Sequence, residues 1–411
     1  MKESFFKVVT PGEVLALFDR FGPVGEDVVP LEKALGCILS RDLTAPEDLP
    51  GFYRSAMDGY AVQAKATFGA TESLPALVQI CGEVRMGQAP EFKVGEGQAA
   101  RISTGGMLPE GADSVVMVEY CHLIDEQTLE VSRAVSPLEH VIQPQDDFQA
   151  GRMVLRQGHR LRPQDVGVMA GLGVRECFVC RKPKVGIISS GDEVVPTAQK
   201  PGPGQVRDIN RYSLGAFCRQ NDADSAYYGL CPDRFEPLKN AVQQALRQTD
   251  TVWISGGSSV GTRDLTLQVL EALPDFQLLV HGISISPGKP TIIGLSGDKP
   301  IIGLPGHVTS ALIIAEIFLK RLLRQLSGRS DPAKPFRGRL EAELNRNVES
   351  ASGREDYIRV TLRKDGDRLI AEPIFGKSAL ISTLVEAHGL IRIPMNTEGL
   401  YKGQAVDVML F

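Results

Sequence analysis

The sequence lacks the features that mark secreted and membrane proteins. Its first residues, MKESFFKVVTPGEV, contain no apolar stretch as long as that of a signal peptide. Its longest apolar run, residues 311–323, is interrupted by Glu316, Lys320 and Arg321, so we do not expect it to span a bilayer. We therefore expect a cytoplasmic protein that makes no membrane contact.

The sequence also has few cysteines and no excess of basic residues. Its seven cysteines are scattered over 411 residues, which argues against a disulfide framework. Cys177 and Cys180 form a single CxxC without a second pair or a nearby histidine, so two ordinary thiols are favoured over a zinc or redox site. The formal net charge of −5 argues against general affinity for nucleic acid.

A chain of 411 residues is longer than one compact core usually serves, so we expect several domains. Residues 1–45 are predicted to be mostly helical, because Pro11 and Pro30 each suit a first helical turn. Residues 142–180, with a short helix from Pro163, join this segment as a linker domain. Residues 46–141 contain short β-rich segments separated by Gly, Pro and Asp, which predicts a small β domain.

Strands and helices alternate from residue 181 to residue 328, which predicts a parallel, three-layer α/β domain. Asp208 or Asn210 is placed to cap one of its helices. Residues 329–411 are β-rich again, and an Asp-Gly pair between two alternating runs predicts a hairpin within residues 357–375. The predicted fold is therefore α/β plus β, with a central α/β domain flanked by a small β domain and a C-terminal β domain.

The α/β domain contains the strongest candidate ligand site, because ligands of such sheets bind beyond the carboxyl ends of the strands. Four segments end a strand or open a helix and are rich in small residues or acids. They are SSGDEVV (189–195), DINRY (208–212), ISGGSSVGTRD (254–264) and GLPGHVTSAL (303–312). The third has neither GK[ST] nor GxGxxG spacing, but small residues before a helix suit a phosphate.

Acidic residues in these segments suggest a metal. Glu193 and Asp264 follow different strands and could converge on one Mg²⁺, which takes one or two carboxylates together with phosphate oxygens. Asp233 is a third candidate. The alternatives are a solvated turn for Glu193 and an ordinary helix cap for Asp264.

Three further positions could bind a ligand. Lys289 lies in a loop stiffened by Pro287 and Pro290, where its charge suits an oxyanion or phosphate, although most lysines are simply exposed. Asp58 lies in SAMDGYAV and Thr104 in ISTGG, outside the α/β domain. An Asp-Gly turn and a strand that leaves into a loop are the ordinary alternatives for these two.

Taken together and in order, seven motifs resemble the molybdopterin molybdenumtransferase family, and also the molybdopterin-binding half of gephyrin. The motifs are SAMDGYAV, ISTGGMLPEGADSVVMVE, SSGDEVV, DINRY, ISGGSSVGTRD, SPGKP and GLPGHVTSAL. The resemblance runs from about residue 7 to the end. It implies an elongated homodimer that takes adenylylated molybdopterin and molybdate, cleaves the pyrophosphate link with Mg²⁺, releases AMP and leaves molybdenum on the dithiolene.

The resemblance also implies residue roles. Catalytic roles fall to Asp58, Thr104, Glu193, Asp233, Asp264 and Lys289, with Glu193 and Asp264 on the metal. The implied substrate-binding residues are Ser190, Gly191, Asp208, Asn210, Gly256, Gly257, Ser258, Ser259, Gly261, Pro305, Gly306, Ser310, Arg354 and Ser378. Of these, Arg354 and Ser378 resemble positions linked to oxyanion binding. A molybdopterin adenylyltransferase and maturation factors of molybdoenzymes are the implied partners.

Two motifs depart from the family pattern. Ser286 stands where much of the family has a lysine before PGKP, and His307 and Val308 replace the Asn and Pro of LPGNPVS. One cation fewer could weaken molybdate binding or change the preferred oxyanion. Use of tungstate, or molybdopterin binding without turnover, is therefore an alternative, and the adenylyltransferase that makes the substrate is a competing function.

Overall fold

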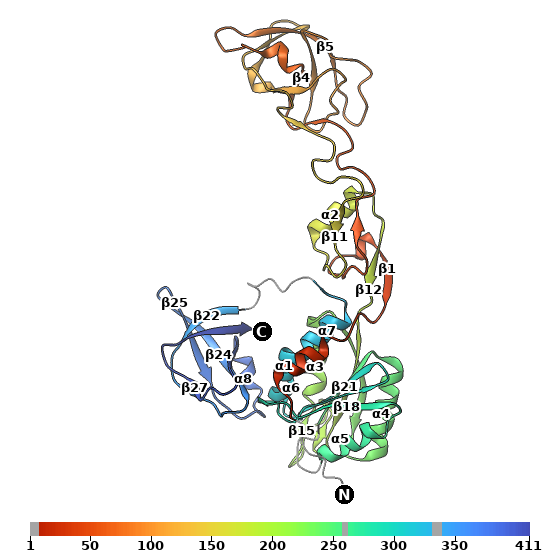
Figure 1. The fold of residues 1–411 in the computed structure, drawn as a ribbon, viewed down its shortest axis with the longest axis vertical. Helices are drawn as coiled ribbons and strands as arrows, with labels where there is room; N and C mark the ends of the chain where they lie inside the picture. Colours follow the sequence, from red (N-terminus) through yellow and green to blue (C-terminus); the bar gives the residue numbers. More distant parts are fainter. Residues whose placement is uncertain (1–7, 257–261, 331–338) are drawn as a thin grey trace.

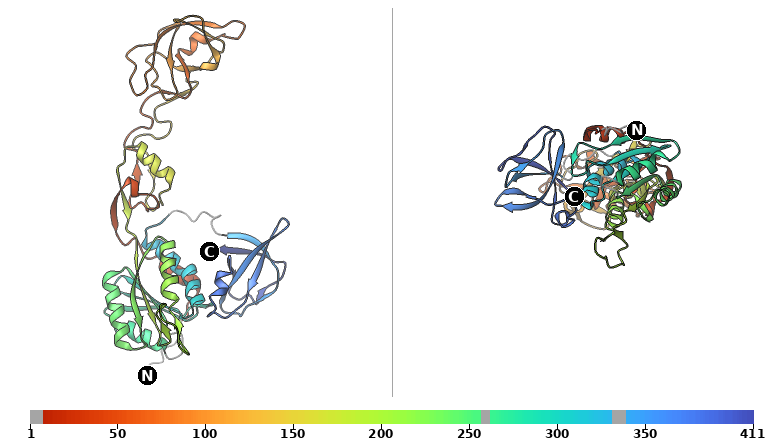
Figure 2. Two further views of the ribbon diagram at one scale, coloured as in Figure 1. Left: turned by 180° about the vertical axis from the view of Figure 1, so that it is seen from behind. Right: turned by 90° about the horizontal axis from the view of Figure 1, so that it is seen from below.

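The computed structural model describes residues 8–256, 262–330 and 339–411, with residues 262–264 and 339 described by their backbone alone. The chain is elongated (Figure 1). A small β domain lies at one end, an extended stalk follows, and an α/β domain lies at the other end with a C-terminal β domain at its side. The two further views in Figure 2 show the same arrangement.

The β domain at the far end, here called the distal domain, is built on a six-stranded sheet with the order β7-β4-β6-β5-β9-β8. Its strands are β4 (Gly59–Val62), β5 (Ala76–Glu83), β6 (Gln98–Ile102), β7 (Ser114–Met117), β8 (Cys121–Leu123) and β9 (Thr128–Val131). Alternate residues such as Tyr60, Val62 and Val78 face one core with Leu129 and Val131. The predicted small β domain is thereby confirmed.

The stalk contains β1 (Glu26–Pro30), which pairs antiparallel with β12 (Glu176–Cys180), and the short helix α2 (Pro163–Gly171). The prediction that residues 1–45 are mostly helical is wrong. The described part, residues 8–45, contains one α-helix, because the β-branched Val28 and Val29 pair with a strand almost 150 positions later in the chain. Cys177 and Cys180 lie within β12, where burial raises the pKa of both thiols.

The α/β domain has a six-stranded sheet with the order β16-β13-β17-β21-β20-β18. Its strands are β13 (Lys184–Ser190), β16 (Asp224–Cys231), β17 (Thr251–Ser255), β18 (Phe276–His281), β20 (Ile292–Ser296) and β21 (Lys299–Leu304). The first four strands in this order are parallel, but β20 and β18 are antiparallel. The prediction of a parallel sheet is wrong at this edge, since only Gly297 and Asp298 connect β20 to β21 and a connection this short permits only a hairpin.

Helices cover both faces of this sheet, which confirms the predicted three layers (Figure 1). On one face pack α1 (Pro11–Phe18), α3 (Asn210–Gln220), α6 (Val308–Ile314) and α7 (Lys320–Leu326), and on the other α4 (Phe235–Gln248) and α5 (Thr262–Glu271). A π-helical turn, Ala315–Leu319, joins α6 to α7. Buried residues of β17 alternate between the layers, because Trp253 faces the first core and its neighbours Val252 and Ile254 face the second.

The C-terminal domain is a small closed barrel. Its strands are β22 (Arg339–Leu344), β24 (Glu355–Asp365), β25 (Arg368–Ile374), β26 (Gly389–Ile393) and β28 (Ala405–Leu410). The barrel closes because β24 pairs with both β25 and β26. The predicted hairpin is β24–β25, with Gly366 and Asp367 at its turn. A short strand before the SPGKP loop, β19 (Ile285–Ser286), adds to β24 in parallel and so ties the barrel to the α/β domain.

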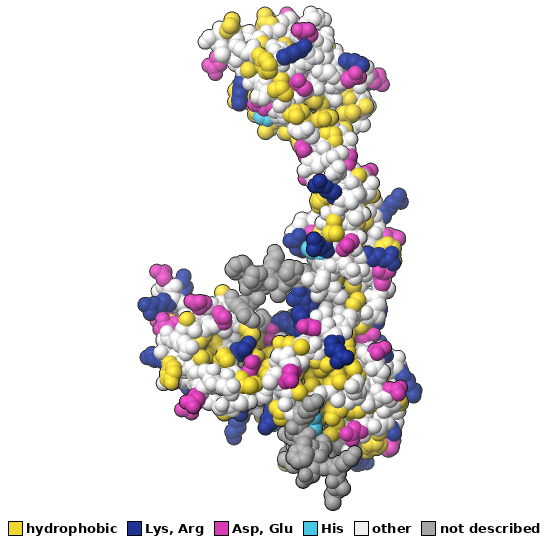
Figure 3. All heavy atoms as spheres, viewed as in Figure 1, with side chains coloured by type: hydrophobic (Ala, Val, Ile, Leu, Met, Phe, Trp, Pro, Cys, Tyr) yellow, Lys and Arg dark blue, Asp and Glu magenta, His cyan; other side chains and the backbone are white. Residues whose placement is uncertain are grey.

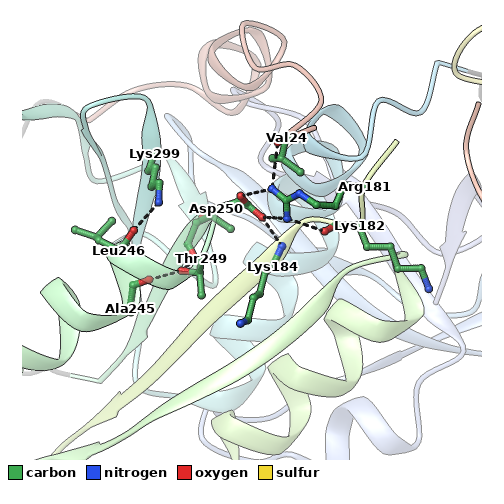
Figure 4. A network of polar contacts seen from close by, with 10 residues as sticks. Val24, Arg181, Lys182, Lys184, Ala245, Leu246, Thr249, Asp250 and Lys299 are labelled. Carbon is green, nitrogen blue, oxygen red and sulfur yellow. Dashed lines mark hydrogen bonds and ion pairs between the residues drawn. The ribbon is translucent and has the colours of Figure 1, made fainter. Parts of the chain in front are cut away.

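The stalk enters the α/β domain at the amino ends of the parallel strands, where Lys184 begins β13 and Asp250 precedes β17 (Figure 4). The Arg181 guanidinium donates to both carboxylate oxygens of Asp250, at 2.8 and 3.1 Å, and to the carbonyl oxygen of Val24 at 3.1 Å. Asp250 Oδ2 also accepts the backbone N–H of Lys184 at 2.7 Å. This cluster, here called the stalk junction, fixes both chain segments of the stalk to the edge of the sheet.

Candidate active site

The carboxyl ends of the four parallel strands bring the predicted segments to one edge of the sheet. β13 ends at Ser190, β17 at Ser255 and β21 at Leu304, and these ends are adjacent in the register of the sheet. β16 ends beside them, with Cys231 opposite Ser190. Segments far apart in sequence therefore meet at one place, here called the strand-end site.

Two turns of this site are held together by Asp233. Ser190 Oγ donates to Asp233 Oδ1 at 2.7 Å, and the Asp233 N–H donates to Asp192 Oδ1 at 3.2 Å. Glu193 is exposed beside them, and within the described ranges its carboxylate accepts no hydrogen bond. The site thus combines an oriented carboxylate with an unengaged one.

Glycine is required where two strand ends approach each other. Gly256 has a φ of 146°, and a Cβ at this position would lie 2.1 Å from the carbonyl oxygen of Ser190. Any side chain would push β13 and β17 apart. Gly256 therefore lets the ends of β13 and β17 pack closely at the strand-end site.

The start of α3 forms a further wall of the site. Asp208 is buried, and its carboxylate accepts the Arg211 N–H at 3.1 Å and the Tyr227 hydroxyl at 3.0 Å. Neither of the two predicted residues is the N-cap of α3, because Ile209 stands there, but Asp208 just before it accepts a backbone N–H of the first turn. Burial, and then the neighbouring Asp208 carboxylate, raise the pKa of Tyr227. The substrate-binding role predicted for Asp208 is untested by these contacts, which engage both of its oxygens.

Asn210 connects α3 to the LPGH turn. Its Nδ2 donates to the carbonyl oxygen of Gly306 at 2.8 Å. Its Oδ1 and Ser255 Oγ are both buried and find no hydrogen-bond partner in the part of the chain that the structure describes. Since buried polar atoms are almost always paired, these two are candidate contacts for a ligand.

The SPGKP loop packs against α6. A Cβ at Gly288, which has a φ of 118°, would lie 2.5 Å from Ile314 Cδ1, so the loop backbone sits directly on this helix. Lys289 is exposed, whereas Pro305 and Ser310 at the start of α6 are buried. The peptide bond between Ser286 and Pro287 is cis.

The C-terminal barrel contributes residues from two loops. His307 Nδ1 lies 2.7 Å from Ser378 Oγ, which brings GKSAL to the LPGH turn. Arg354 Nε lies 3.1 Å from Oδ1 of the buried Asp356, which stands opposite Ser286 in the β19–β24 pair. The sequence analysis did not single out Asp356, although it stands two residues after the predicted contact Arg354.

Asp58 and Thr104 form a pair in the distal domain. Asp58 Oδ1 accepts the Thr104 N–H at 2.7 Å and its hydroxyl at 3.1 Å. They are neighbours because β4 and β6 pair antiparallel, with Gly59 opposite Ile102. Within one chain they lie at the opposite end of the molecule from the strand-end site (Figure 1). The structure brings Asp58 and Thr104 together but does not bring them to the residues of the strand-end site.

Some predicted site residues lie outside the described part of the chain. These are Gly257, Ser258, Ser259 and Gly261. For Asp264 only the backbone, in α5, is described. Among the side chains that are described, no group of three or more His, Cys, Asp or Glu is arranged to hold a metal ion by itself.

The described helices include none that is long and apolar enough to cross a membrane. On the face shown in Figure 3, basic and acidic side chains are interspersed over all the domains. This mixture agrees with the small net charge of the sequence.

Comparison with known proteins connects this geometry to one family. The model of the MoeA N-terminal region (domain I and II) matches residues 9–173, that of a probable molybdopterin binding domain matches residues 186–325, and that of the MoeA C-terminal region (domain IV) matches residues 341–411. The chain is 31% identical to a molybdopterin molybdenumtransferase of Haemophilus influenzae, covering 95% of each, and 29% identical to one of Bacillus subtilis, covering 93% of this chain and 89% of the relative.

A solved structure shows the same arrangement. The molybdopterin biosynthesis moea protein of Pyrococcus horikoshii superimposes with a TM-score of 0.84 at 36% identity, covering 98% of this chain and 99% of that one. The sequence relationships and the shared multidomain fold agree. The chain is therefore a member of the molybdopterin molybdenumtransferase family.

Proposed function

We propose that this protein inserts molybdenum into adenylylated molybdopterin, cleaving the pyrophosphate link and releasing AMP, in the final step of molybdenum cofactor biosynthesis. The observation that carries the proposal is the strand-end site. In a chain of this family, it joins the Ser190–Asp233 pair, the unengaged Glu193 carboxylate and the open backbone at Gly256. Such a site suits a ligand with a pyrophosphate group.

The residues of the site have separate tasks in this proposal. Gly256 lets the ends of β13 and β17 lie close together, and backbone N–H groups at such strand ends can hold anionic oxygens without adding a mobile charge. Asn210, through Gly306, keeps α3 and the LPGH turn at a fixed distance. Ser190 holds the Asp233 carboxylate in one orientation toward the substrate.

The available donors suit Mg²⁺, which prefers oxygen ligands and completes its shell with water and substrate phosphate. The exposed, unengaged Glu193 carboxylate fits this requirement, and no cage of three protein ligands is needed. Glu193 and Asp264 would hold the ion. When bound, Mg²⁺ neutralises charge on the pyrophosphate as the phosphorus–oxygen bond breaks.

Molybdate is an oxyanion, so cations and hydroxyls are suitable ligands for it. Lys289, Arg354 and Ser378 are the proposed contacts. They come from the SPGKP loop and the barrel, which meet through β19 and β24. The barrel therefore completes the side of the strand-end site at which the second substrate enters.

We also propose a homodimer in which the distal domain of one subunit serves the strand-end site of the other. The supporting observation is that Asp58 and Thr104 form a pair in the domain farthest from that site (Figure 1). The proposed domains are residues 1–45 with 142–180, 46–141, 181–328 and 329–411. A molybdopterin adenylyltransferase would supply the substrate, and a cytoplasmic location is expected.

An AMP-release assay tests the proposed function. Protein mixed with adenylylated molybdopterin, molybdate and Mg²⁺ should release AMP and form molybdenum cofactor. In a parallel assay with ATP and molybdopterin, consumption of ATP with release of pyrophosphate would identify an adenylyltransferase, whereas tight molybdopterin binding without AMP release would identify a binding protein. Running the assay with tungstate in place of molybdate decides which oxyanion is preferred.

A further inference from the structure

The turn after β21 departs from the family motif where it meets the barrel. His307 replaces the usual asparagine, and its Nδ1 lies 2.7 Å from Ser378 Oγ. The two residues belong to different domains, 71 positions apart in the chain. A side chain that departs from the common family motif therefore bridges the α/β domain and the barrel, and we call the two residues the interdomain pair.

The side of the pair that lies in the α/β domain is held rigidly. Asn210 Nδ2 donates to the carbonyl oxygen of Gly306 at 2.8 Å, directly before His307. Thr309, which is fully buried in the first turn of α6, donates its hydroxyl to the carbonyl oxygen of Leu380 at 3.2 Å. His307 thus lies between Gly306 and Thr309, which are both held by hydrogen bonds. It contacts the barrel loop that Thr309 also contacts.

The barrel side is a loop, residues 376–380, with one anchor of its own. The buried Arg359 in β24 donates through Nη2 to the carbonyl oxygen of Gly376 at 3.2 Å. The Leu380 N–H then closes a turn onto the carbonyl oxygen of Lys377 at 3.0 Å. The loop is therefore held at its start from the barrel core and, at Ser378 and Leu380, from α6.

We propose that His307 is a positioning residue whose hydrogen bond to Ser378 fixes the 376–380 loop beside the strand-end site. The inference rests on the proposed function, because the loop presents its groups to the oxyanion that this function requires. Loss of the bond frees the loop from α6 at its centre and lowers the fraction of molecules in which the oxyanion site is assembled. A binding site that is assembled only part of the time has a weaker apparent affinity.

Kinetics of variants test the proposal. His307→Ala and Ser378→Ala should each raise KM for molybdate about 10-fold, the effect of one lost hydrogen bond, and change kcat much less. The double variant should be no worse than Ser378→Ala alone, because Ser378→Ala already removes the bond to His307 together with its own proposed contact to molybdate. His307→Asn should stay close to wild type, since an amide at this position can make the same contact. His122→Ala and Ser382→Ala, at exposed positions without such a contact, are the matched controls.

Hydrogen exchange of the backbone amides in residues 376–380 gives a readout that needs no activity. His307→Ala should speed this exchange, and His122→Ala should leave it unchanged. Exchange and KM both unchanged in His307→Ala would overturn the proposal. If the wild-type protein released no AMP, the proposed function would fail, whereas the exchange measurement would still decide whether His307 orders the loop.

Discussion

The α/β domain is joined to its two neighbours in different ways. At the stalk junction, Arg181 and Asp250 form a bidentate ion pair, and a second cluster joins Arg160 to Asp222 at 2.8 Å. At the barrel, the contacts include a two-residue strand pair, β19 with β24, hydrogen bonds of His307 and Thr309, and apolar packing, because Tyr357 and Leu390 of the barrel are buried in the core cluster that contains α1 and α6. Charged pairs therefore mark the stalk junction, whereas apolar packing, backbone pairing and neutral hydrogen bonds hold the barrel.

This difference bears on function because charge-assisted, bidentate hydrogen bonds are about twice as strong as neutral ones and fix orientation more tightly. A stalk junction fixed by such a pair orients the distal domain, with Asp58 and Thr104, as the proposed sharing of sites between subunits requires. The substitutions below change one region at a time.

The largest effect is expected from Asp250→Ala. It leaves the Arg181 guanidinium and the Lys184 N–H without their acceptor in a partly buried place. We expect the free energy of unfolding to fall by about 3 kcal/mol. Urea denaturation measures it, with the exposed Asp298→Ala as control. A loss no larger than that of the control would contradict the view that this ion pair fixes the stalk.

The second effect concerns acid stability within the stalk. Burial of Asp165 opposes its ionisation, but hydrogen bonds from Arg162 and His159 outweigh this and hold its pKa well below the ordinary value. Because the folded-state pKa is lowered, the stabilisation is present above the ordinary pKa of about 4 and is lost as the pH falls below it. Asp165→Asn should cost about 2 kcal/mol at neutral pH.

Denaturation between pH 7 and pH 3 tests this second prediction. The free energy of unfolding of the wild-type protein should exceed that of Asp165→Asn by less and less as the pH falls. Plotted against pH, the two stabilities should therefore converge in acid. Asp147→Asn, at an exposed position, is the control. Curves that stay parallel down to pH 3 would show that Asp165 does not have a lowered pKa.

The third change, Ser286→Lys, restores the cation that much of the family carries in the SPGKP loop. Ser286 lies opposite Asp356 in the pair that joins the barrel, so the new charge enters close to the proposed oxyanion contacts. We expect KM for molybdate to fall about 5-fold, equivalent to about 1 kcal/mol at a partly exposed site. Ser284→Lys, two residues earlier, is the control. A higher KM for molybdate in Ser286→Lys would mean that the oxyanion does not bind near this loop.

The smallest effect on stability is expected from Arg359→Met in the barrel. Burial lowers the pKa of the Arg359 guanidinium, and within the described residues its Nε has no hydrogen-bond partner. A methionine of similar length removes this buried charge, so the free energy of unfolding should change by less than about 1 kcal/mol. Arg363→Met, on the exposed part of the same strand, is the control. A loss of about 3 kcal/mol would mean that the charge itself stabilises the barrel.

The sequence predicts the strand-end site well because each part of it is local. An apolar run that stops at serine, glycine or aspartate predicts a strand end, and parallel strands bring such ends together. Ser190, Asp233 and Asn210 lie where this reasoning puts them. Their roles in binding and catalysis, like those of the other predicted site residues, are hypotheses for the experiments above.

Features that depend on distant partners could not be predicted in this way. The pairing of β1 with β12 depends on a strand almost 150 positions later in the chain, so the local proline pattern predicted the wrong structure. The contact of His307 with Ser378 arises only when the barrel packs on α6. The burial of Arg359 could not be predicted from its alternating strand, because it arises when β24 pairs with β26 and closes the barrel.

The central claim is that two subunits build each site, and a mixed dimer tests it most directly. Asp58→Ala and Glu193→Ala subunits carrying different tags are expressed together, and the heterodimer is purified. Each parent variant should release little AMP, whereas the heterodimer should recover about half of the wild-type rate, because one of its two sites contains neither substitution. A heterodimer as inactive as both parents, beside a fully active wild-type dimer prepared in the same way, would contradict the claim.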